Sequence, residues 1–127
     1  MKKLGFILAI VVFALSSAFA EISDDLAACF RTGNAKEFSK FFDGTIDLDI
    51  PGNEGTYSKA QAEQILKDFF SKSHVKGYTP GHQGESKEGA RFLMGTLNTI
   101  GGAYRTYIHV RKVGDVYTIK ELRIENN

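Results

Sequence analysis

Two aspartates separated by one residue are the first candidates for chemistry in this chain. Asp47 and Asp49 alternate with Ile46, Leu48 and Ile50, and this period-two pattern predicts a half-buried β-strand. Both carboxylates then lie on one face of the strand, where they could bind a metal ion or act as an acid and base pair. No histidine occurs at ligand spacing nearby, and alternating acids commonly form the solvated face of a strand. We therefore expect both carboxylates to point outward.

The remaining reactive side chains do not form a known motif. Cys29 is the only cysteine, so no intrachain disulfide can form, and its spacing from Leu26 predicts a buried thiol on a helix face. His74, His82 and His109 are expected to be solvated or hydrogen-bonded. The sequence contains no metal-ligand spacing, phosphate-binding glycine loop or repeat. We therefore expect no catalytic residue, no cofactor and no metal.

An apolar segment with the three parts of a secretory signal peptide opens the chain. Two lysines precede an apolar run from Leu4 to Leu15, and Ala18-Phe19-Ala20 forms a small-x-small cleavage site. The run is too short to span a bilayer comfortably, and no cysteine follows it to carry a lipid anchor. We predict that residues 1–20 are removed by cleavage between Ala20 and Glu21.

Removal of the signal peptide changes the charge of the protein. The full chain has 16 Lys and Arg against 15 Asp and Glu, and two lysines leave with the signal, so the mature balance is 14 against 15. Without a basic excess, nucleic acids and anionic membranes have no electrostatic attraction for the domain, and neither is an expected partner. Residues 21–127 suffice for one domain, which we expect in the periplasm or outside the cell.

Helices are predicted in the first half of this domain. The first carries Ile22, Leu26 and Phe30 on one face and ends at Gly33. The second begins at Asn34, an N-cap residue. Its reciprocating acid is Glu37, and its apolar stripe consists of Phe38, Phe41 and Phe42. A third helix begins with a capping box of Ser58 and Gln61, and its apolar stripe consists of Ala62, Ile65, Leu66, Phe69 and Phe70.

The segments around the third helix are predicted to be extended. Gly55 to Tyr57 forms a short strand before it, and Val75 to Gln83 forms an irregular strand after it, because Gly77, Pro80 and Gly81 weaken the pattern. A polar loop from Gly84 to Gly89 follows.

The last third of the chain, Arg91 to Ile124, reads as three antiparallel strands. The turns are Gly101-Gly102 and Gly114-Asp115, so Ile100 should face Ala103. The expected core face carries Leu93, Gly95, Leu97, Thr99, Tyr104, Thr106, Ile108 and Val110. The opposite face mixes Phe92, Met94, Ile100 and Tyr107 with Asn98, Arg105, His109 and Arg111.

The final strand leaves one question open. Pairing through Gly114-Asp115 places Ile119 beside Val110 on the core face, yet simple alternation sends Leu122 and Ile124 to the other face. A β-bulge near Lys120 or Glu121 would return both to the core. The sequence does not decide between these arrangements.

The order of elements predicts an α+β domain with helices on one face of a curved antiparallel sheet. The opening helix pair, the strand Ile46 to Ile50, the capped helix from Ser58 and the run from Gly95 to Ile108 resemble the nuclear-transport-factor-two-like (NTF2-like) superfamily of cone-shaped, cystatin-like folds. More narrowly, the chain is similar to small exported bacterial proteins of a domain-of-unknown-function family.

The resemblance implies a pocket between the helices and the concave sheet face. The side chains expected to bind a ligand there are Tyr57, Thr99, Tyr104 and Thr106. The preferred hypothesis is a non-catalytic domain that binds a small apolar ligand, or that pairs with a protein partner such as a second copy through the mixed sheet face. The alternative is an isomerase or lyase of ketosteroid-isomerase or polyketide-cyclase type, with Tyr104 holding an oxyanion and Asp47 or Asp49 as the base.

Overall fold

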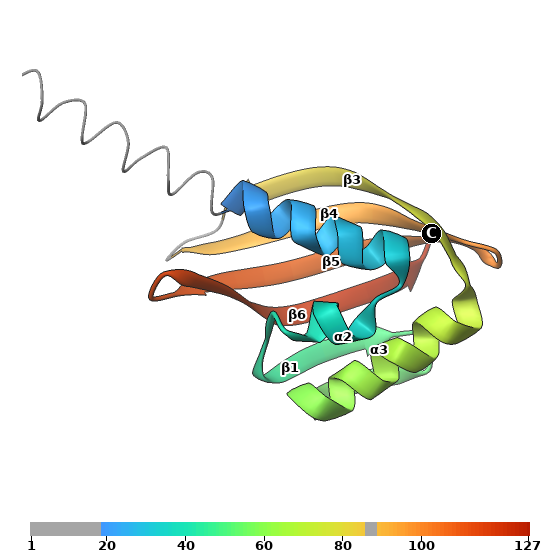
Figure 1. Cartoon of the computed structure of the whole chain (residues 1–127), viewed down its shortest axis with the longest axis horizontal. Helices are drawn as coiled ribbons and strands as arrows, with labels where there is room; N and C mark the ends of the chain where they lie inside the picture. Colours follow the sequence, from blue (N-terminus) through green and yellow to red (C-terminus); the bar gives the residue numbers. More distant parts are fainter. Residues whose placement is uncertain (1–18, 86–88) are drawn as a thin grey trace, which may run out of the picture.

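A curved six-stranded sheet carries the helices on one face in the computed structural model, which describes residues 19–85 and 89–127 (Figure 1). The first helix spans residues 19–32, and two more follow, α2 (Ala35–Ser39) and α3 (Lys59–Ser73). The strands are β1 (Phe42–Ile50), β2 (Asn53–Ser58), β3 (Val75–Glu85), β4 (Ala90–Thr99), β5 (Gly102–Val113) and β6 (Val116–Asn126). This architecture confirms the predicted α+β fold. Most of the predicted signal peptide and residues 86–88 of the predicted polar loop lie outside the described residues.

The strands lie in the order β2-β1-β6-β5-β4-β3. Neighbouring strands are antiparallel except β1 and β6, which run parallel. The expectation of a purely antiparallel sheet was therefore wrong at this one pairing. The last strand returns to the middle of the sheet beside the first one, and after the intervening hairpins it runs in the same direction.

Alternation of side chains along β4 and β5 puts one face of the sheet into the core. Leu93, Leu97, Ile108 and Val110 are all buried, as predicted, and they share one cluster with the apolar stripe of α3. Met94 on the opposite face is 41% exposed. The sheet therefore has a dry concave face under the helices and an outer face open to solvent.

The β4–β5 turn lies one residue earlier than predicted, which shifts the cross-strand pairing by two residues. Thr99 pairs with Gly102, so the loop residues are Ile100 and Gly101 and not Gly101 and Gly102. The observed register lets the Thr99 hydroxyl donate to the Gly102 carbonyl (2.8 Å), and the Ile100 N–H donates to the carbonyl of His74 (3.1 Å). A slip of two residues keeps every side chain on its predicted face, because the side-chain period of a strand is two.

The β5–β6 ladder contains the bulge that the sequence left open. Val110 pairs with Ile119 and His109 pairs with Glu121, so Lys120 is the extra residue on β6. Leu122 and Ile124 are consequently buried in the core. The side chain of Lys120 reaches β1 and forms an ion pair with Asp43.

Helix ends largely follow the predicted capping. Gly33 has a φ of +60° directly after the first helix, and the Asn34 side chain accepts a hydrogen bond from the Glu37 N–H (3.1 Å). The prediction that α2 extends to Phe42 was wrong, because α2 ends at Ser39 and Phe42 begins β1. There the backbone joins the sheet, where the Ile119 N–H donates to the Phe41 carbonyl (2.7 Å).

The segments on either side of α3 also agree with the sequence. Both bonds of the Ser58 and Gln61 capping box are present at the start of the helix. The strand β3 pairs with β4 through two register shifts, between Val75 and Gly77 and between Pro80 and Gln83, so its predicted irregularity is confirmed. This bent strand forms one edge of the sheet.

The inner face has no room for a side chain at Gly95, so we predict that Gly95→Ala destabilises the domain. A Cβ there would overlap the hydroxyl of Tyr78, whose ring stacks on Phe30 with centroids 4.6 Å apart. Overpacking of this kind costs about 2 kcal/mol in unfolding free energy. Urea denaturation measures it. Gly77→Ala is the matched control, since nothing lies within 4 Å of a Cβ there. Equal midpoints for the two variants would contradict the packing.

The ion pair at the bulge predicts a pH-dependent stability. Its hydrogen bond from Lys120, with a second from the Gly44 N–H, holds the pKa of Asp43 below its usual value of 3.8. A carboxyl pKa that is lower in the folded than in the unfolded protein stabilises the fold at neutral pH. This stabilisation is lost as the pH falls from 3.8, the ordinary value, through the pKa of the folded protein. Asp43→Asn should lose about 0.5 kcal/mol at pH 7, because the pair is solvent-exposed, and less at pH 2.5, where more of the carboxyl is protonated. Thermal unfolding at both pH values, with Asp49→Asn as control, measures this; a loss of the same size at both pH values would contradict it.

Candidate functional site

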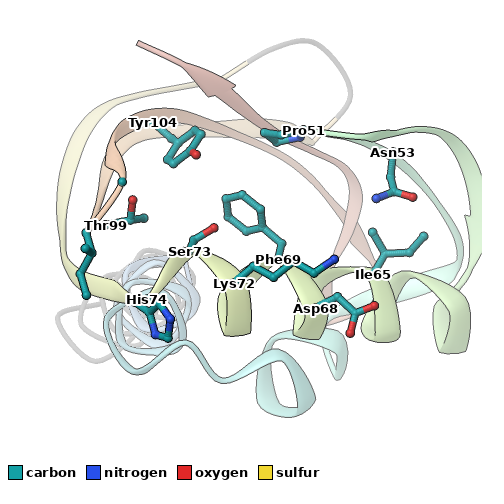
Figure 2. A pocket seen from close by; sticks show the side chains of 12 residues that line it. Pro51, Asn53, Ile65, Asp68, Phe69, Lys72, Ser73, His74, Thr99 and Tyr104 are labelled. Atoms are coloured by element: carbon teal, nitrogen blue, oxygen red, sulfur yellow. The ribbon is translucent and has the colours of Figure 1, made fainter.

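A cavity of about 500 Å³ opens at one end of the concave face. The C-terminal half of α3 forms one side, and the β1–β2 turn and the β4–β5 turn form the others (Figure 2). Three segments far apart in the sequence therefore meet around one space. A volume of this size is in the range of small-molecule sites in proteins.

The apolar part of the cavity comes from α3 and β5. Phe69 lies edge-on to Tyr104, with ring centroids 5.4 Å apart and an interplanar angle of 80°. Ile65 stands one turn before Phe69 on the same helix face and is half-buried. The helical repeat that buries Leu66 and Phe70 in the core turns these two side chains toward the cavity.

The polar part of the cavity is made mainly of neutral groups. Figure 2 shows the Tyr104 hydroxyl directed into the space, and this hydroxyl has no hydrogen-bond partner among the described residues. Asn53 and Ser73 add further polar side chains at the rim. Asp68 and Lys72 line the exposed side of the cavity, and Lys72 extends along α3 toward Ile65 (Figure 2). The two charges form no ion pair in the described part of the chain.

The end of α3 is fastened to the β4–β5 turn through His74. This residue is the C-cap of the helix and adopts a left-handed conformation with φ of 56°, which is uncommon for residues other than glycine. Its N–H donates to the carbonyl of Phe70, and its own carbonyl accepts from the N–H of Ile100, both at 3.1 Å. These two bonds fix the width of the cavity mouth on this side.

The structure brings together two of the four residues predicted to bind a ligand. Thr99 and Tyr104 both line the cavity, although the Thr99 hydroxyl donates to its own turn. Thr106 is buried deeper, where its hydroxyl lies 3.5 Å from that of Tyr78. Tyr57 packs against the core from β2 and lies outside this cavity.

The two aspartates lie on the outer face of the sheet, as expected. Asp47 accepts a hydrogen bond from the Thr56 hydroxyl (2.7 Å), and both aspartates border a shallow surface hollow with Glu54 and Arg123. The sheet itself separates these carboxylates from Tyr104. The isomerase arrangement, with Asp47 or Asp49 as base and Tyr104 as oxyanion donor, is therefore inconsistent with this geometry.

Two other reactive side chains, Cys29 and His82, do not line the cavity. Burial raises the pKa of the Cys29 thiol to about 11, and the nearby Glu37 and Asp25 add to this effect. His82 lies beside Phe92 on the outer face, with ring centroids 6.0 Å apart. Among residues 19–85 and 89–127, no group of three or more His, Cys, Asp and Glu side chains could hold a metal ion. Over the same ranges no helix is long and apolar enough to cross a membrane.

The sequence identified two of the twelve residues that line the cavity, Thr99 and Tyr104. Ile65 and Phe69 belong to the five-residue apolar stripe of α3, which has the ordinary spacing of a helix that packs on a core, so the pattern did not distinguish them from Leu66. Pro51 and Asn53 carried no signal, because the role of a turn residue depends on tertiary contacts.

Helices on one face of a curved, unclosed sheet define the class of protein. A domain of unknown function with a cystatin-like fold from Nostoc punctiforme is 15% identical with a TM-score of 0.67, covering 90% of this chain and 78% of that chain. A solved structure named Rd1NTF2_04 with long sheet is 16% identical with a TM-score of 0.65, covering 83% and 97%. These similarities show an NTF2-like, cystatin-like fold, as the sequence resemblance predicted.

A family model and solved structures with higher sequence identity to this chain show which family it belongs to. The family model of a domain of unknown function, DUF4783, matches residues 23–125. A DUF4783 family protein from Bacteroides ovatus ATCC 8483 is 30% identical with a TM-score of 0.76, covering 81% of this chain and 93% of that chain. The chain therefore belongs to the DUF4783 family. The comparison with curated proteins finds no match.

Proposed function

We propose that the cavity at the mouth of the concave face binds a small, neutral, largely apolar ring compound. The observation that carries this proposal is the Tyr104 hydroxyl, which faces the cavity without a hydrogen-bond partner among the described residues beside the apolar wall of Phe69. A polar group in such a position fixes the orientation of a ligand, and the apolar wall supplies the binding free energy. The ligand therefore carries one hydroxyl or carbonyl group on an apolar ring body.

Binding without turnover accounts for the side chains around the cavity. Proton abstraction requires a base within hydrogen-bond reach of the bound compound. Asp47 and Asp49 lie across the sheet, and the side chains of Asp68 and His74, which line the cavity, are exposed to solvent. The Tyr104 hydroxyl, beside the apolar ring of Phe69, can donate a hydrogen bond to a ligand oxygen. We therefore propose a carrier or sensor of a small molecule and not an isomerase or lyase.

Export of the protein is the second part of the proposal. It is supported by the basic start, the apolar run and the small residues before Glu21. Cleavage after Ala20 has a structural cost, because Phe19 packs edge-on against Tyr117 with centroids 5.6 Å apart, beneath the guanidinium of Arg91. The exported domain then relies on the remaining core contacts at this end of the sheet.

The processing step predicts a defined mature mass. Intact-mass spectrometry of the protein recovered from the envelope or medium of its host should show a chain that begins at Glu21. A full-length chain that stays in the cytoplasmic fraction would contradict export. A mature chain that begins at another residue would confirm export and correct the cleavage site.

Ligand binding predicts that Tyr104→Phe weakens affinity for a neutral ring alcohol. With 2-naphthol as the probe, loss of one neutral hydrogen bond should raise the Kd about fivefold in isothermal titration calorimetry. Tyr57→Phe is the matched control, since Tyr57 packs against the core and lies outside the cavity. Its Kd should equal that of the unmodified protein. No binding of the probe, or an equal effect of both variants, would overturn the proposal.

A further inference from the structure

A second hollow lies on the outer face of the sheet, on the other side from the cavity that Tyr104 borders. It has a volume of about 510 Å³ and follows two neighbouring rows of cross-strand partners. One row consists of Met94, Tyr107 and Arg123, and the next consists of Thr96, Arg105 and Glu125. Gly81 and His82 on β3 close its end. We call this hollow the outer groove.

Aromatic rings form one border of the outer groove. Phe92 and Tyr107 stack with centroids 6.1 Å apart and an interplanar angle of 20°, and His82 lies beside Phe92. Gly84 under the Phe92 ring makes this arrangement possible, because a Cβ there would overlap the ring. Three neighbouring strands thus contribute a row of rings that ends at Tyr107. The exposed side chain of Met94 adjoins it.

Two guanidinium groups in the groove have donors available for a ligand. Arg123 lies over the Tyr107 ring at 5.4 Å, and its Nε atom pairs with Glu121. The side chain of Arg123 is 49% exposed, so its guanidinium remains accessible to a ligand. Arg105 approaches Glu125 only to 3.8 Å, which is longer than a hydrogen bond, and its side chain is 66% exposed. Releasing Arg105 from so weak a contact costs little.

We propose that the outer groove binds a small organic anion that carries a ring, such as an aromatic carboxylate. Arginine binds carboxylates through paired N–H donors, and aromatic and thioether side chains pack against ring faces. The acid of the ligand lies between Arg105 and Arg123, and its ring lies over Met94 and Tyr107. Both arginines line the groove from adjacent strands, so one acid group can contact both.

The charges around the groove favour an anion over a cation. Two arginines and one carboxylate, Glu125, are the charged side chains among the described residues that line the groove. Glu121 already pairs with Arg123, and the aspartates of β1 border the neighbouring hollow, which Arg123 also lines. This second site therefore differs in ligand charge from the neutral cavity on the concave face, and it does not depend on ligand binding there.

A titration of the isotope-labelled protein with 1-naphthoate, followed by amide chemical shifts, tests the proposal. The protein is used in the form that its host produces. We expect shifts at Met94, Thr96, Arg105 and Tyr107, and an affinity about tenfold higher than for the neutral analogue 1-naphthalenemethanol. Arg105→Gln and Arg123→Gln should each weaken 1-naphthoate about tenfold. Arg31→Gln, an exposed arginine on the first helix, is the control and should have no effect.

Three results would overturn the proposal. One is equal affinity for the acid and the alcohol, which would remove the role of the guanidinium groups. Another is a set of shifts confined to Phe69, Ser73 and Tyr104, which would place the probe in the other cavity. The third is a set of shifts at Met94 and Tyr107 that depends on protein concentration without any probe, which would identify the outer groove as a contact between two copies of the chain.

Discussion

Every feature of this domain depends on the requirement that one face of a single sheet stay dry. Leu93, Leu97, Ile108 and Val110 meet the helices on that face, and their alternation would be lost on β6 without an extra residue. The bulge at Lys120 keeps Leu122 and Ile124 inward. Because strand side chains have a period of two, the same requirement sends Met94, Tyr107 and Arg123 to solvent. The division of the molecule into two chemically different surfaces follows from this constraint.

The two surfaces differ in the polar groups that they present. At the mouth of the concave face, neutral groups dominate, and the Tyr104 hydroxyl stands beside Phe69. On the outer face, guanidinium groups stand beside stacked rings. One strand, β5, supplies side chains to both, since Tyr104 and Tyr107 differ by an odd number of positions. Asp47 and Asp49, the two carboxylates proposed as a base, belong to the outer face, which is why ligand binding without turnover fits the concave site.

Local rules were enough to predict the elements and the faces of the sheet. The caps at Asn34 and Ser58 depend on side chains within three residues, and both were found as expected. A shift of two residues in the β4–β5 pairing left the faces unchanged, because side chains alternate with a period of two. The sequence indicated the place of a possible bulge, near Lys120 or Glu121, but alternation could not decide that it forms, since that depends on the partner strand. The parallel pairing of β1 with β6 is a choice among topologies that alternation does not constrain.

The ligand sites were harder to predict, because they consist of residues from separate elements. Tyr104 was identified from its face, but Ile65, Phe69 and Asn53 join it only through the packing of α3 against two turns. The most direct test is a crystal structure of the protein purified from its native host. We predict electron density for a bound compound between Phe69 and Tyr104, within hydrogen-bond distance of the tyrosine hydroxyl. A cavity closed by its own side chains, with Phe69 packed into the space, would contradict the central claim.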